Sequence, residues 1–96
     1  MAIVTTMRLE GDPDELLRNK REIIDPISME LAPQHGGIAH ICARSDDGLL
    51  IVNLWENEEG MEEVAEQVGA KAQAAGLPKP VDWHQYELVQ HETPGG

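Results

Sequence analysis

The sequence contains few aromatic residues and few basic ones. Among 96 residues there are two Trp, one Tyr and no Phe, and seven Lys and Arg stand against 18 Asp and Glu, for a net charge of −11. Proteins that bind single-stranded nucleic acid need several aromatic side chains in a basic surround. A strongly acidic chain also repels phosphate backbones and anionic membrane surfaces. We therefore expect neither nucleic acid nor a membrane as a partner.

Cysteine and long apolar runs are also lacking. A single cysteine, Cys42, excludes an internal disulfide. No apolar run approaches the roughly 20 residues of a membrane span, and the first residues do not follow the pattern of a secretion signal. We expect a cytoplasmic protein with one domain over residues 1–90. Residues 91–96 carry no apolar side chain and are expected to form a flexible tail.

The apolar pattern that is present predicts strands and helices in the order βαββαβ. Strands are expected over 2–9, 38–44, 49–55 and 81–89. Asp12 and Pro13 predict the start of the first helix, and Pro26 predicts a kink or break near Asp25. Asn57 is expected to cap the second helix and Gly76 to end it. This order is typical of the ferredoxin-like α+β fold, a four-stranded antiparallel sheet with two helices on one face.

The strand over 49–55 predicts that the other face of the sheet is covered as well. Leu50, Val52 and Leu54 alternate with Ile51 and Trp55, so both faces of the strand are apolar. Two helices cover only one face, and we expect it to be the face of Asn53 and Trp55. A second copy of the chain is the simplest cover for the other, so we expect a homodimer whose sheets pack face to face in a barrel.

The hairpin at residues 45–48 decides which side chains meet across the sheet. A three-residue loop with Gly48 in the left-handed region places Ile41 opposite Asn53, with His40 on the face away from Trp55. We expect this register. A loop of two or four residues would instead put His40 beside Asn53 and Trp55.

Four residues are candidates for a site: Asn53, Trp55, His40 and Tyr86. Asn53 is a neutral amide in an apolar strand and must be hydrogen-bonded, either to a ligand oxygen or to a neighbouring group. Trp55 either forms one wall of a pocket for a planar ligand or fills the core. His40 is a general base or a hydrogen-bonded residue of the dimer interface. Tyr86 donates to a ligand oxygen or lies at the dimer seam.

A metal site is not expected. His40 and Cys42 share one face of a strand, but the third candidate ligand, His35, is in a loop. Structural zinc takes four ligands, and catalytic zinc takes three and a water. No further residue has the spacing of a ligand motif.

Three segments carry a resemblance to a known group. G-D-P-D-E-L-L (11–17), A-R-S-D-D-G-L (43–49) and V-N-L-W-E-N-E-E (52–59) resemble antibiotic-biosynthesis-monooxygenase-like members of the dimeric α+β barrel superfamily. That superfamily includes cofactor-free oxygenases of aromatic polyketides, haem degraders and isomerases. The resemblance implies a small-molecule-binding homodimer, in which Asn53 holds oxygen, Trp55 stacks on an aromatic ligand, and His40 or Tyr86 manages a proton.

The activity implied by the resemblance is cofactor-independent oxygenation of an aromatic or polyketide-like substrate, with no cofactor and no metal. A non-catalytic binding or accessory dimer, or an isomerase or cyclase of the same fold, is the alternative. Haem-degrading members are similar in pairing an Asn on strand one with a His on the second helix. This chain has Thr5 and Thr6 on strand one and no His in the second helix.

Overall fold

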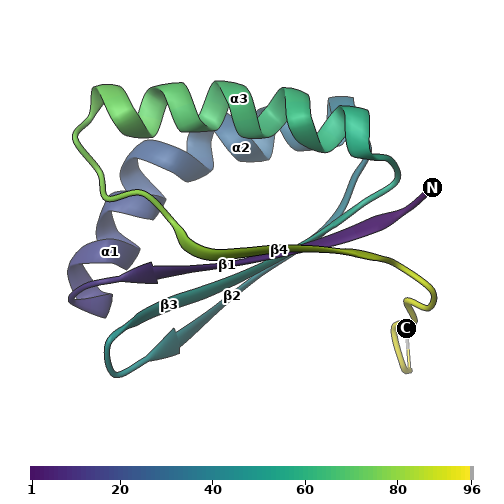
Figure 1. Ribbon diagram of the computed structural model, residues 1–96, viewed down its shortest axis with the longest axis horizontal. Helices are drawn as coiled ribbons and strands as arrows, with labels where there is room; N and C mark the ends of the chain where they lie inside the picture. The colour runs from purple at the N-terminus through teal and green to yellow at the C-terminus, as the bar shows by residue number, and fades with distance from the viewer. Residues whose placement is uncertain (96) are drawn as a thin grey trace.

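A four-stranded antiparallel sheet carries a layer of helices on one face (Figure 1). This computed structural model describes residues 1–95. The elements are β1 (Ile3–Glu10), α1 (Pro13–Asn19), the π-helical turn η1 (Lys20–Ile24), α2 (Asp25–Leu31), the 3-10 turn η2 (Ala32–His35), β2 (Gly37–Ser45), β3 (Gly48–Trp55), α3 (Glu58–Ala74) and β4 (Val81–Glu87). The strand order β2-β3-β1-β4 puts β3 and β1 in the centre. The predicted βαββαβ order is confirmed.

The first helical segment runs through α1, η1 and α2. Pro13 occupies the first helical position, where its missing N–H costs nothing. Asp12 does not cap the helix with its side chain, contrary to the prediction; its carbonyl oxygen accepts the first helical bond, from Leu16 N–H at 2.9 Å. The interruption predicted near Asp25 is the π-helical turn, in which the Asp25 N–H donates to the Lys20 carbonyl. The chain thus passes Pro26 without leaving the helix layer.

The second predicted helix is α3, and both of its predicted ends are found. The Gly60 N–H donates to Asn57 Oδ1 at 2.7 Å, which is the expected side-chain cap. Gly76 adopts φ 73°, and the Leu77 N–H then donates to the Ala72 carbonyl at 3.0 Å. The helix therefore stops where the chain turns back toward β4.

The hairpin between β2 and β3 differs from the predicted one. Ser45 pairs with Gly48, so the loop has two residues, and His40 pairs with Asn53. The three-residue loop was wrong because Gly48 is not in the left-handed region. A Cβ on Gly48 would collide with the Leu9 carbonyl oxygen of β1, so the glycine permits close approach of a neighbouring strand. His40 consequently lies on the helix-covered face.

The core lies between the sheet and the helices. Ile3 and Trp55 from the sheet pack with Met61 and Val64 of α3. Leu49 is 2% exposed and also faces the helices. Among residues 1–95, no helix is long and apolar enough to cross a membrane.

Within the described part of the chain, the opposite face of the sheet has no helix over it. Ile41, Leu50 and Tyr86 lie on this face and are 52%, 40% and 55% exposed. We call it the open face, defined by these three side chains. Of the predicted tail, residues 91–95 contain no helix or strand, and residue 96 lies outside the described residues.

Candidate functional site

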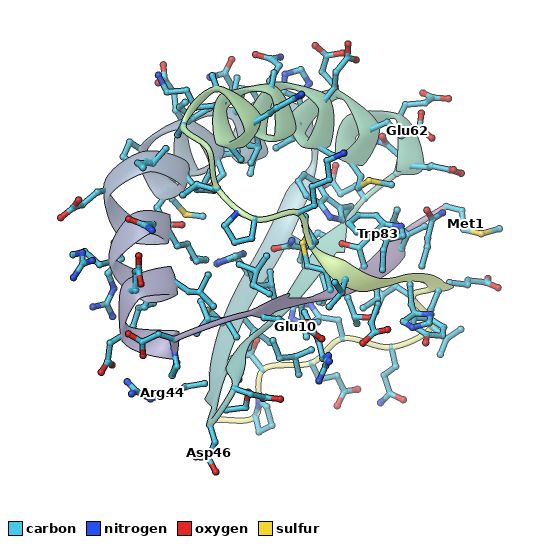
Figure 2. The ribbon with its side chains drawn as sticks, turned by 60° about the vertical axis from the view of Figure 1, so that its left-hand side comes forward. Met1, Glu10, Arg44, Asp46, Glu62 and Trp83 are labelled. Atoms are coloured by element: carbon cyan, nitrogen blue, oxygen red, sulfur yellow. The ribbon has the colours of Figure 1, made fainter. Side chains whose placement is uncertain are left out.

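A cavity of about 790 Å³ lies between the sheet and the helix layer. Its walls are mainly apolar and include Met7 of β1, Ile51 of β3, Ile24 of η1 and Val68 of α3. The segment between α3 and β4 forms its rim together with Trp83, which lies beneath α3 in Figure 2. Ligand sites in proteins typically have volumes of about 300–1,000 Å³ with a few polar groups in an apolar lining. The cavity has the size and the lining of a small-molecule site.

His40 and Asn53 form a hydrogen-bonded pair on the sheet side of this cavity. They are cross-strand partners in β2 and β3, and both line the cavity. His40 Nδ1 lies 2.5 Å from Asn53 Oδ1. Because an amide oxygen only accepts, Nδ1 is the nitrogen that carries the proton, and a neutral imidazole then has an unprotonated Nε2. The Asn53 amide oxygen thus accepts from a neighbouring strand, and it orients the ring of His40.

Trp55 belongs to the core and to the cavity wall at once. It is 6% exposed and packs in the central apolar cluster, yet part of it lines the cavity. Its indole N–H donates to Thr5 Oγ1 at 3.4 Å. Since that donor is occupied, Trp55 offers a ligand its flat apolar surface. Thr5, fully buried and opposite Asn53 in β1, was not singled out from the sequence.

Tyr86 lies apart from the other three candidates. It pairs with Val4 on β1, and its ring stacks on His84 with the centroids 6.2 Å apart. Both rings project from the open face, whereas Asn53, Trp55 and His40 line the cavity on the helix-covered face. The structure therefore brings together three of the four sequence-predicted residues.

The helix side of the cavity carries an ion pair that sequence reasoning missed. Lys20 Nζ lies 2.7 Å from Asp25 Oδ1, and the lysine is 6% exposed although it is charged. Both residues line the cavity. A spacing of five residues does not bring side chains together on an α-helix. The π-helical turn provides that alignment, and no local sequence signal announces it.

A second ion pair lies at the surface. Arg44 near the end of β2 lies beside the start of α1 in Figure 2, and its Nη1 is 2.6 Å from Asp14 Oδ1. The hydrogen bond and the charge of Arg44 hold the pKa of the Asp14 carboxyl below its usual value.

Within residues 1–95, no group of three or more His, Cys, Asp or Glu side chains is arranged to hold a metal ion. Cys42 is half-buried and free.

Comparison with known proteins relates the chain to solved structures. No protein-family model matches the sequence, and no curated protein matches it. A putative antibiotic biosynthesis monooxygenase from Chloroflexus aurantiacus matches with a TM-score of 0.69 and 15% identity, over 99% of this chain and 100% of the other. A dimeric ferredoxin-like protein from an uncultured marine organism matches with a TM-score of 0.69 and 13% identity, over 97% and 99%.

A third similar structure is a variant of SnoaB, a cofactor-independent oxygenase from Streptomyces nogalater. It matches with a TM-score of 0.61 and 15% identity, over 99% of this chain and 96% of the other. The structural neighbours are thus antibiotic-biosynthesis-monooxygenase-like, dimeric ferredoxin-like proteins, over nearly the full length. At these identities the likeness establishes the fold.

Proposed function

We propose that this protein is a homodimeric α+β-barrel protein that binds a small aromatic or polyketide-like molecule and oxygenates it without a cofactor. The observation that carries the proposal is the His40–Asn53 pair on the wall of a mainly apolar cavity. An oriented imidazole is suited to remove a proton near neutral pH. The oxygenase among the structural neighbours supports this class of chemistry on the same fold.

The reaction requires a substrate that itself supplies the electrons. In anthrone, the methylene carbon bears an acidic proton, which His40 Nε2 would accept while Asn53 holds the protonated Nδ1. The resulting carbanion is electron-rich and reacts with O₂. Overall, anthrone and O₂ give anthraquinone and water. One oxygen atom of O₂ becomes the new carbonyl oxygen on the former methylene carbon, and the other leaves as water. The substrate provides all four electrons. Trp55 would form a flat wall against the aromatic rings of the substrate.

The open face supports the dimeric part of the proposal. Three large side chains (Ile41, Leu50 and Tyr86) are exposed there on a regular sheet. The exposed apolar side chains of β2 and β3 form a patch of the kind found at interfaces, while Thr6, Arg8 and His84 add polar groups to this face on β1 and β4. One structural neighbour is a dimeric ferredoxin-like protein, which points the same way. In this arrangement Tyr86 would belong to the dimer seam.

Oxygen uptake with anthrone tests the activity. We expect uptake that scales with protein concentration and forms anthraquinone in air but not under nitrogen. His40→Ala should lower the rate by about 100-fold or more, which is the usual contribution of a general base. His91→Ala is the matched control, since it removes an exposed imidazole that lies outside the helices and strands, and its rate should stay close to that of the unmodified protein. Equal rates for both variants would contradict the assignment of His40.

A non-catalytic binding or accessory dimer is the second candidate. It is favoured by Trp55, which packs in the core and whose N–H is already bonded. Tight binding of anthrone without any oxygen uptake would support this candidate. Conversion of a polyketide-like substrate at equal rates in air and under nitrogen would instead indicate an isomerase or cyclase.

A further inference from the structure

The buried ion pair on the helix side of the cavity has a chemistry that the proposed reaction does not use. A lysine that is 6% exposed is uncommon, because burying an ammonium costs several kcal/mol unless it is well paired. Its ammonium has three N–H donors. Within residues 1–95, its recorded side-chain bond is the one to Asp25 Oδ1, at 2.7 Å. Two donors thus remain in a mainly apolar setting.

A second polar group, on the wall of the same cavity, is without a partner among the described residues. Ser28 is three residues beyond Asp25, on the adjacent turn of α2, and it also lines the cavity. Its Oγ is buried, and among the described residues it is the one buried side-chain oxygen without a hydrogen-bond partner. Leaving a buried hydroxyl without a hydrogen bond costs stability, so such a group is free to bond to a ligand that enters the cavity. Lys20 and Ser28 together provide donors for an oxygen-bearing ligand.

We propose that Lys20 is an anion-binding residue of the cavity and that the ligand is an aromatic carboxylate. A carboxylate has two acceptor oxygens and is ionised at neutral pH, so it matches an ammonium with free donors and a hydroxyl on the wall of the same cavity. A phenol would first have to lose a proton with a pKa of about 10. Asp25 holds the ammonium in place. This inference rests on the proposed small-molecule site and deepens it, since the acid group would dock at η1 and the aromatic body would lie against the apolar walls.

Two matched probes test the proposal: anthracene-2-carboxylate and the neutral anthracene-2-carboxamide, followed by their own fluorescence. We expect the carboxylate to bind at least about tenfold more tightly than the amide, as a charge-assisted hydrogen bond in an apolar site predicts. Lys20→Met should bring the ratio of the two affinities, carboxylate to amide, close to one and leave amide binding nearly unchanged. Asp25→Asn should preserve the ratio, because the ammonium remains.

Lys20→Met leaves Asp25 unpaired, so the double variant Lys20→Met/Asp25→Asn is measured beside it, and thermal unfolding verifies that each is folded. Lys71→Met on the exposed side of α3 is the matched control for a lost charge, and it should keep the ratio. Loss of the ratio in Lys79→Met, at the cavity rim, rather than in the Lys20 variants would overturn the assignment.

The outcomes separate this inference from the function on which it rests. If the two probes bind equally well to the unmodified protein, Lys20 is not an anion-binding residue, while the small-molecule site stands. If neither probe binds, both the cavity site and the role of Lys20 are wrong. A ratio that survives in a folded double variant also overturns the inference.

Discussion

The two faces of the sheet are built from alternate residues of the same strands, yet they have different properties. On the helix-covered face, Leu49 and Trp55 are almost fully buried, and the polar pair His40–Asn53 lies on a cavity wall. On the open face, Ile41 and Leu50 are large, apolar and exposed. The first face combines core packing with polar chemistry. The second presents apolar surface, which makes it the proposed dimer interface.

This difference shows how much depends on strand register. A shift of one residue between β2 and β3 exchanges the faces of every side chain on β2. With the observed register His40 meets Asn53, whereas with the alternative it would join Leu50 on the open face. The same histidine would then belong to an interface rather than to a cavity.

The same charge introduced on neighbouring residues of β3 should have opposite consequences for folding. Leu49→Asp places a carboxylate where the side chain is 2% exposed. It removes buried apolar contacts and buries an unpaired charge, which should cost more than about 4 kcal/mol of the free energy of unfolding. A small domain has only about 5–15 kcal/mol in total. Circular dichroism should show a largely unfolded chain; a cooperative melt near that of the unmodified protein would contradict the assignment of Leu49 to the core.

Leu50→Asp should leave the fold intact and break the dimer. Leu50 is already 40% exposed in a single chain, so the charge stays hydrated there. In a symmetric dimer each substitution enters the interface twice and replaces an apolar contact by a carboxylate opposite Arg8 of β1, which should weaken association by at least about 100-fold. Sedimentation should find a dimer for the unmodified protein and a folded monomer for the variant at micromolar concentration. A variant that remains dimeric would place the interface elsewhere.

Much of the helix-covered face could be predicted from local sequence. Alternation along β3 correctly placed Trp55 and Asn53 toward the helices, and Asn57 and Gly76 correctly marked the ends of α3. These features depend on side-chain period and on capping chemistry, which act over a few residues. The order of strands and helices along the chain followed from the same local elements.

Two features of the site could not be predicted because distant contacts determine them. The face of His40 follows from the two-residue hairpin, and Gly48 is required by the backbone of β1, far away in the chain. The Lys20–Asp25 pair exists because a π-helical turn aligns residues five apart. A helical pattern read from sequence assumes the α-helical period and so separates these two side chains.

The smallest expected effect concerns how the helix layer is held at the edge of the helix-covered face. Arg44 of β2 and Asp14 of α1 form an exposed ion pair there, with Nη1 and Oδ1 2.6 Å apart. Apolar packing should account for nearly all of the free energy that keeps the helix layer on the sheet, because exposed ion pairs are screened by water and salt. Asp14→Asn should therefore lower the midpoint of thermal unfolding only slightly at neutral pH, and high salt should shrink even that difference.

The pH dependence gives this small effect a recognisable sign. Arg44 lowers the pKa of Asp14 from its ordinary value of 3.8 in the folded protein. The contribution of Asp14 to stability is therefore fully present above the unfolded pKa and is lost as the pH falls through the lowered folded pKa. The midpoints of the unmodified protein and of Asp14→Asn should differ at neutral pH and converge in acid below pH 3.8. A difference that is large, or that grows in acid, would mean that this edge of the helix layer depends on charge rather than on packing.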